Sequence, residues 1–302
     1  MTNTLPPHLE LKETGSSGRG LFSTRVIPKG DIIFSSPAAA TALHRKHLPL
    51  FCQNCFTYTE DVESPCSVVC QCCMSTYYCS QKCYENDADL HSPHCSLLSQ
   101  VLTSKALKKE ESCHVRLLLR LLSRCYLDSN VLTSVEMMML DHKGIPGFKR
   151  RSLQREKAAT YFLSMLPPVV EKEKVKEEEK EEEKVKVKEE EEEAGETTTI
   201  GTLAMQLEKF PCFRTKLKLI NFLAKGPAND FALFDVEGES CGSGYFPFAA
   251  LSNHSCFPSS AVQIEGTNMV RVYIYIYTVY IFKNLFFVFG HIYQYLYSTR
   301  RL

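Results

Sequence analysis

The chain has 302 residues, 35 basic and 35 acidic side chains, and 44% hydrophobic residues. This hydrophobic fraction excludes a wholly disordered chain, and 14 glycines with 14 prolines exclude collagen-like and low-complexity architectures. The length allows one large domain, or two modest ones, with a packed core.

Residues 9–51 mix short β-prone runs with turn signals. The runs are Val26-Ile27 and Ile32–Phe34, and the turn signals lie at Gly15–Gly20 and Pro28–Gly30. This alternation predicts short strands that are joined by tight turns.

Cysteine is concentrated between Cys52 and Cys95, a segment that holds nine of the 14 in the chain. The first 25 residues lack the apolar segment of a secretory signal, so we expect thiolate metal ligands in a reducing compartment rather than disulfides. Two ligands three or four residues apart can reach one tetrahedral ion from a single turn, and two such pairs complete its coordination. The predicted pairs are Cys52 and Cys55, Cys70 and Cys73, Cys79 and Cys83, and His91 and Cys95.

Eight ligands predict two zinc ions. Joining the first pair to the third, and the second to the fourth, would interlock the loops of a segment that has too few large apolar residues for its own core. Cys66 and Cys72 are spare, and Cys72 or His94 could replace a neighbouring ligand. Cys73 is preferred to Cys72 because it keeps two residues between itself and Cys70.

Residues 96–228 are predicted to be largely helical. Within residues 114–127, Val115, Leu118, Leu119 and Leu122 recur on one face of a helix, and three arginines recur every four residues on another. Helical periodicity resumes over residues 200–224 and is broken at Pro211.

The run 171–193 contains 13 Glu, 7 Lys and 3 Val, which gives it a net charge of −6 and leaves +6 on the rest of the chain. It has almost no apolar residues to bury, so we predict a solvated insert; a solitary exposed helix with many charge pairs is the alternative.

Residues 229–270 return to strands and turns. The tail 271–302 is rich in Tyr, Ile and Phe, and three interpretations compete for it. It could be a membrane anchor over residues 272–290, although Lys283 and Asn284 lie near the middle of that stretch. It could be a pair of buried strands, or non-native sequence from an altered gene end, which we favour.

The cysteine segment 52–95 resembles a MYND zinc finger. The likeness rests on the four ordered ligand pairs, with Tyr78-Cys79-Ser80 preceding Cys83 and three residues between His91 and Cys95. Such fingers take proline-rich peptides, which makes a peptide of this kind an expected partner. The family usually has Trp three residues before the ligand His, where this chain has Ala88, and that difference argues against peptide binding while leaving zinc binding intact.

The order of motifs resembles the SET and MYND family of protein-lysine methyltransferases over roughly residues 9–265. Gly18-Arg19-Gly20-Leu21 comes first, the finger and a helical middle follow, and Asn253-His254-Ser255-Cys256 comes last. The resemblance implies an α+β fold, in which a SET β-fold of short strands is split by the finger and a helical insert. The expected segments are an N-terminal SET part 9–51, the finger 52–95, the helical insert 96–228, a C-terminal SET part 229–270 and the atypical tail 271–302.

The resemblance also implies S-adenosylmethionine as methyl donor. By position, Ser17, Gly18 and Arg19 would wrap this cofactor through backbone groups, and Asn253 and His254 would hold its amino-acid and adenine portions. The substrate would be a lysine of a histone or another protein, and the expected location is the nucleus or the cytoplasm. Nothing in the sequence points to nucleic acid, and a membrane is not expected.

Two family features are missing after Asn253. The tyrosine that lines the lysine channel of the family has no counterpart that we can assign, so the catalytic residue is unknown. Cys256 is the last cysteine, so the Cys-x-Cys-x2-Cys group that would complete a third zinc site is absent. A SET domain truncated in its C-terminal part is therefore expected, and the alternative function is an inactive zinc-binding interaction module.

Overall fold

The computed structural model describes residues 5–14, 19–58, 66–138, 147–167, 199–234, 240–254, 260–265, 269–274 and 286–287. In these residues short strands and helices are mixed along the chain, which confirms the predicted α+β class. The Glu/Lys run 171–193, Ser17, Gly18 and Cys256 lie outside the described residues.

Two strands from the start of the chain form an antiparallel hairpin, β1 (Leu9–Glu13) with β2 (Arg19–Ser23). The next strand, β3 (Ile32–Pro37), pairs with β11 (Met269–Ile274), which also pairs with β10 (Ser260–Glu265). Strand β11 therefore continues past residue 270 into the segment 271–302 that we expected to be an atypical tail.

A second sheet also joins the two ends of the chain. β4 (Ala40–Leu43) pairs with β8 (Ser240–Tyr245), which pairs with β7 (Asp230–Phe234). The backbones of β4 and β8 approach closely at Gly242, where an added Cβ would lie 2.8 Å from Leu43 Cα. Short strand β9 (Asn253–His254) runs parallel to β12 (Phe286–Phe287).

The middle of the chain is helical, as its periodicity predicts. The α-helices after the finger are α2 (Cys95–Thr103), α3 (Lys109–Leu127), α4 (Asn130–Glu136), α5 (Phe148–Met165), α6 (Thr199–Lys209), α7 (Lys216–Ala224) and α8 (Gly226–Asn229). The 3-10 turn η4 (Pro211–Arg214) separates α6 from α7 at the proline that the sequence marks as a break. Further 3-10 turns are η2 (Arg45–Leu50) and η5 (Ala249–Leu251).

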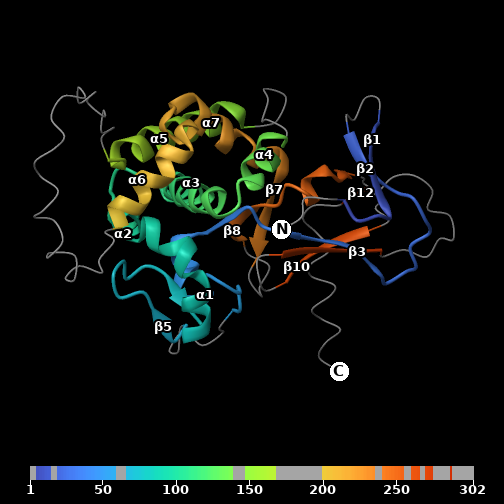
Figure 1. Cartoon of the computed structure of the whole chain (residues 1–302), viewed down its shortest axis with the longest axis horizontal. Helices are drawn as coiled ribbons and strands as arrows, with labels where there is room; N and C mark the ends of the chain where they lie inside the picture. Colours follow the sequence, from blue (N-terminus) through green and yellow to red (C-terminus); the bar gives the residue numbers. More distant parts are fainter. Residues whose placement is uncertain are drawn as a thin grey trace, which may run out of the picture.

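Helix α3 is the centre of the helical layer. Its apolar residues are buried on more than one face, because Leu117 and Leu121 are enclosed as fully as Leu118 and Leu122. Helices α5, α6 and α7 surround it, as Figure 1 shows. A second core lies between the sheets and includes Ile33, Leu43 and Phe246.

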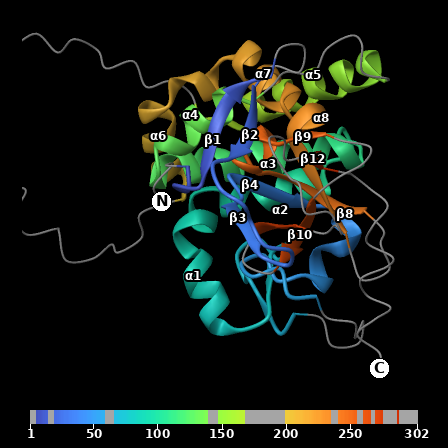
Figure 2. The same ribbon diagram turned by 90° about the vertical axis from the view of Figure 1, so that its right-hand side faces the viewer.

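The cysteine-rich segment forms a separate lobe on the helical layer. It contains β5 (Val68–Val69), β6 (Tyr77–Tyr78), α1 (Gln81–His91) and the 3-10 turn η3 (Ser92–His94). In both views α1 lies at the bottom and α7 at the top, and in Figure 2 the strands β3 and β4 lie between them. Within the described residues no helix combines the length and apolar character that a membrane span needs.

Candidate functional site

Four cysteines from two loops and a helix meet at the outer end of the finger. The Sγ atoms of Cys52, Cys55, Cys79 and Cys83 all lie within 4.8 Å of one another. The Cys55–Cys79 and Cys79–Cys83 sulfur pairs are 3.5 and 3.6 Å apart. Cys83 is in the first turn of α1, and its N–H donates to the Oγ of the N-cap Ser80 at 3.3 Å. The first predicted ligand pair thus lies against the third.

The second and fourth predicted pairs meet closer to the helical layer. Cys70, Cys73, His91 and Cys95 are all buried, and their ligand atoms also lie within 4.8 Å of one another. His91 Nε2 is 3.2 Å from Cys70 Sγ and 3.7 Å from Cys73 Sγ, and the sulfurs of Cys70 and Cys95 are 3.5 Å apart.

The two Cys-x2-Cys turns share one backbone geometry. The residue after the second cysteine, Phe56 or Met74, has a positive φ of 58° or 49°. In each turn the N–H of that residue donates to the carbonyl of the first cysteine at 2.9 Å. This turn aims both sulfurs of a pair to the same side, which is the local reason why the spacing forms half of a tetrahedral site.

The donor sets fit zinc. A tetrahedral ion with Zn–S bonds of about 2.3 Å sets neighbouring sulfurs about 3.8 Å apart, close to the separations found in both groups. Four ligands leave no open position, so the chemistry available is structural rather than catalytic. In the second group the hydrogen bond from His91 lowers the pKa of the Cys70 thiol to about 6. That thiolate is the form that a metal takes.

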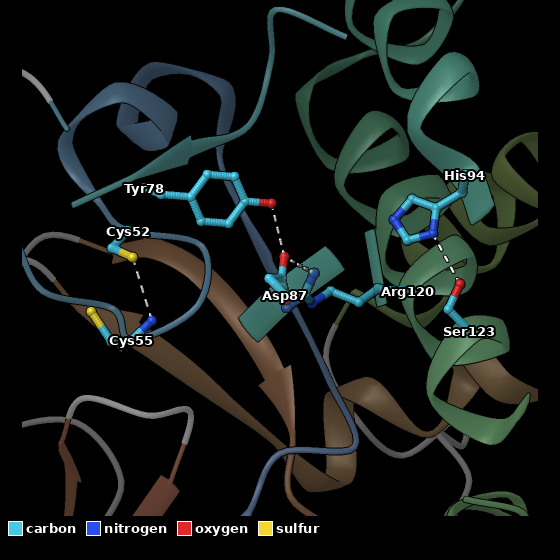
Figure 3. Close-up of polar contacts among 7 residues, drawn as sticks. All are labelled: Cys52, Cys55, Tyr78, Asp87, His94, Arg120 and Ser123. Carbon is cyan, nitrogen blue, oxygen red and sulfur yellow. Dashed lines mark hydrogen bonds and ion pairs between the residues drawn. The ribbon is translucent and has the colours of Figure 1, made fainter. Parts of the chain in front are cut away.

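The two alternative ligands, His94 and Cys72, and the spare Cys66 lie outside these groups. His94 is buried and faces α3, where its Nδ1 is 3.0 Å from Ser123 Oγ (Figure 3). Cys72 is exposed, whereas Cys73 is buried within the second group. Cys66 packs against Cys52, and burial raises the pKa of its thiol to about 11.

A buried ion pair connects the finger to the helical layer, and the sequence gives no direct sign of it. The carboxylate of Asp87 in α1 accepts a hydrogen bond from each of the two terminal nitrogens of Arg120 in α3, at 2.6 and 3.2 Å. The hydroxyl of Tyr78 donates to the same carboxylate at 3.0 Å, as Figure 3 shows. Burial raises the pKa of Tyr78, so this hydroxyl stays neutral and remains a donor. Because all three side chains are buried, this network fixes how the finger sits on α3.

The predicted cofactor residues that are described come from strands at opposite ends of the chain, and the fold brings them together. Gly20 of β2 packs so tightly on Asn253 of β9 that an added Cβ would overlap the Asn253 amide nitrogen. The neighbouring Arg19 is exposed, and its Nη2 donates to the carbonyl of Met137 at 3.3 Å. His254 follows Asn253 in β9.

Among the tyrosines whose side chains the structure describes, none is assigned to a lysine channel. Tyr245 is the nearest tyrosine before Asn253, and it is buried in the core, where its hydroxyl donates to the carbonyl of Phe222 at 3.0 Å. That contact gives Tyr245 a packing role, and the catalytic residue of the chain stays unassigned.

The fold and the paired Cys/His groups are consistent with a SET and MYND type of architecture, and the comparisons point to the same class. No family model matches the chain. The chain is similar to mouse "N-lysine methyltransferase SMYD2", with 26% identity over 254 residues, which are 84% of this chain and 48% of that protein. The human protein of that name is 26% identical over 250 residues, or 83% and 47% of the two chains.

A frog relative extends the match slightly. "N-lysine methyltransferase SMYD2-B" of Xenopus laevis is 26% identical over 264 residues, which cover 87% of this chain and 50% of that protein. The chain thus spans about half the length of the curated relatives it matches. This similarity supports a relationship to the SET and MYND protein-lysine methyltransferases.

Proposed function

We propose that the chain is part of a protein-lysine N-methyltransferase that uses S-adenosylmethionine. The observation that carries the proposal is the packing of Gly20 against Asn253, because it unites two motifs that are more than 200 residues apart in sequence. The similarity to N-lysine methyltransferases supports the same class of reaction.

When bound, S-adenosylmethionine would supply a sulfonium methyl group, whose carbon a neutral amine can attack in line while S-adenosylhomocysteine leaves with the electrons of the broken C–S bond. Gly20 lets the Asn253 amide lie directly against the backbone of β2, and that amide offers one acceptor and two donors to a polar ligand. The lysine must arrive neutral although its ordinary pKa is about 10.4, so an apolar approach that disfavours the charged form is required. The role of the protein is to align the two reactants and exclude water.

Two zinc ions would be structural in this proposal. One would be held by Cys52, Cys55, Cys79 and Cys83, and the other by Cys70, Cys73, His91 and Cys95. They would keep the finger folded and docked on α3 rather than act on a substrate, because each donor set is complete.

Several finer parts of the proposal rest on the resemblance alone. These are a histone or another protein as methyl acceptor, a proline-rich peptide as ligand of the finger, and residence in the nucleus or the cytoplasm. The domain limits at residues 51, 95, 228 and 270 are likewise proposed.

The second candidate is a zinc-binding interaction module without activity. It is favoured by Tyr245, whose buried hydroxyl donates to the carbonyl of Phe222 in the core and is therefore not available to a substrate lysine.

Calorimetric titration of S-adenosylmethionine into zinc-loaded protein separates the candidates, provided that zinc is counted in the same sample. Binding with two zinc ions supports the methyltransferase, and two zinc ions without binding support the interaction module. Gly20→Ala should weaken binding, because the new methyl group would push the Asn253 amide from its place, and it should keep both zinc ions, because their ligands lie within residues 52–95. Lys12→Ala is the matched control. Lys12 lies opposite Gly20 in the hairpin, but its side chain is half exposed and it is not among the residues proposed to hold the cofactor. Equal binding by both variants would contradict the placement of the cofactor.

A further inference from the structure

Three consecutive carbonyls at the end of α4 are held by two cationic side chains. Lys225 Nζ donates to the carbonyls of Glu136 and Met138 at 2.7 and 2.8 Å. Between them, the carbonyl of Met137 accepts from Arg19 Nη2 at 3.3 Å. The last carbonyls of a helix lack partners within the helix and carry partial negative charge, so cations are favourable at this position.

Lys225 is unusual for a lysine because it is 5% exposed. It follows the last residue of α7, and its own carbonyl accepts from the Asn229 side chain at 2.7 Å. The backbone of Lys225 is thus tied to α8, and its ammonium to the carbonyls of Glu136 and Met138. Lys225 therefore holds the end of α4 in place relative to α7.

The end of α4 is also the point at which the proposed cofactor site meets the helical layer. Arg19 binds Met137, the next residue Gly20 packs on Asn253, and β2 and β9 are thereby tied to α4. The contacts thus form a continuous series from Lys225, through the turn 136–138, to Arg19.

We propose that Lys225 is a positioning residue for the cofactor site. It fixes the turn 136–138, and this turn orients Arg19 beside Gly20 and Asn253. This inference rests on the proposed function, because the site it serves is the one that the S-adenosylmethionine proposal assigns.

A neighbouring lysine provides a contrast within the same contact region. Lys218 of α7 pairs with the side chain of Glu136 at 3.5 Å, and both side chains are about half exposed. Exposed pairs of this kind contribute little to stability, and this one leaves the carbonyls of the turn untouched. Lys218 is therefore the matched control for Lys225.

The experiment compares Lys225→Met, Lys225→Arg and Lys218→Met with the parent protein. Hydrogen exchange of the ligand-free protein is measured over residues 19–23 and 130–138, and binding of S-adenosylhomocysteine is measured by calorimetry. Lys225→Met should speed exchange in both segments and weaken binding about tenfold, as loss of charged hydrogen bonds predicts. Lys225→Arg should recover part of the affinity, and Lys218→Met should stay within about twofold of the parent.

A purely structural role predicts a different pattern. If Lys225→Met lowers the melting temperature but leaves exchange over residues 19–23 and affinity unchanged, the inference is overturned. If Lys225→Met fails to fold, Lys225→Arg is read alone: its bulkier cation cannot keep both carbonyl contacts of Lys225, so it should speed exchange over residues 19–23 and weaken binding, and unchanged exchange and affinity would overturn the inference. A parent protein that binds no S-adenosylhomocysteine refutes the proposed function instead, and the exchange data still decide whether Lys225 orders residues 19–23.

Discussion

Removing Arg120 is the sharpest test of how the finger is attached. In Arg120→Met the Asp87 carboxylate, 2% exposed, keeps only the Tyr78 hydroxyl of the three hydrogen bonds that it now accepts. The carboxylate would be left charged and buried without a counterion. Loss of one partner from a buried pair costs about 3–5 kcal/mol, which is a large part of the stability of an ordinary domain.

The expected loss can be separated from a simple packing defect by a double-mutant cycle. Asp87→Asn removes the charge but keeps a side chain of similar shape that can still accept from Tyr78. The double variant Arg120→Met with Asp87→Asn should therefore be less destabilised than the sum of the single variants, with a coupling of about 1–3 kcal/mol. Urea unfolding followed by circular dichroism in zinc-containing buffer measures all four proteins.

Arg124→Met is the control, because Arg124 lies one turn further along α3 and its buried Nε has no hydrogen-bond partner among the described residues. We expect this change to cost less than Arg120→Met. A loss below about 1 kcal/mol for Arg120→Met, or strict additivity in the cycle, would refute the interpretation that the ion pair secures the finger.

Three further predictions concern the metal, pH and the finger turn. His91→Gln should lower the zinc content from two ions to one, whereas His94→Gln should keep both, as mass spectrometry under native conditions would show. Burial, together with the charge of Arg155, lowers the pKa of His114 to about 4. Its contribution to stability is therefore complete above the ordinary value near 6.5 and is lost as the pH falls towards 4, by up to about 1.4 kcal/mol per pH unit. His114→Gln should remove this part of the acid sensitivity in unfolding curves, and an unchanged pH dependence would contradict it. Met74→Gly should raise the free energy of unfolding by up to about 1 kcal/mol, since Met74 is exposed with a positive φ, and a loss would show that its side chain matters.

The ligand groups show what sequence can predict well. Members of one pair lie within a single turn, so spacing alone identifies them. The alternating arrangement was expected because it interlocks the loops of a segment without its own core. The structure brings the same eight residues together, while occupancy by zinc stays a prediction.

The connections between segments are what sequence does not reveal. The arginines of α3 recur every four residues, which by itself fits a solvated stripe, yet Arg116 and Arg120 are buried. One signal was present: leucines fill the other faces of this helix, so the arginines also had to be enclosed and needed partners. Which groups become the partners of these arginines, and which groups bind Lys225, depends on how elements that are distant in sequence pack together.

The pairing of β3 with β11 has a consequence for how the protein is made. The two strands are separated by residues 38–268 in the chain, so β3 leaves the ribosome long before its partner is synthesised. The ligands of both metal groups lie within residues 52–95 and can close much earlier. Until residue 274 emerges, β3 has no partner strand at that edge, and an unpaired apolar strand favours aggregation. A metal-stabilised finger would then be ordered long before the sheet of β3 closes, and its order in the nascent chain would depend on the supply of zinc during synthesis.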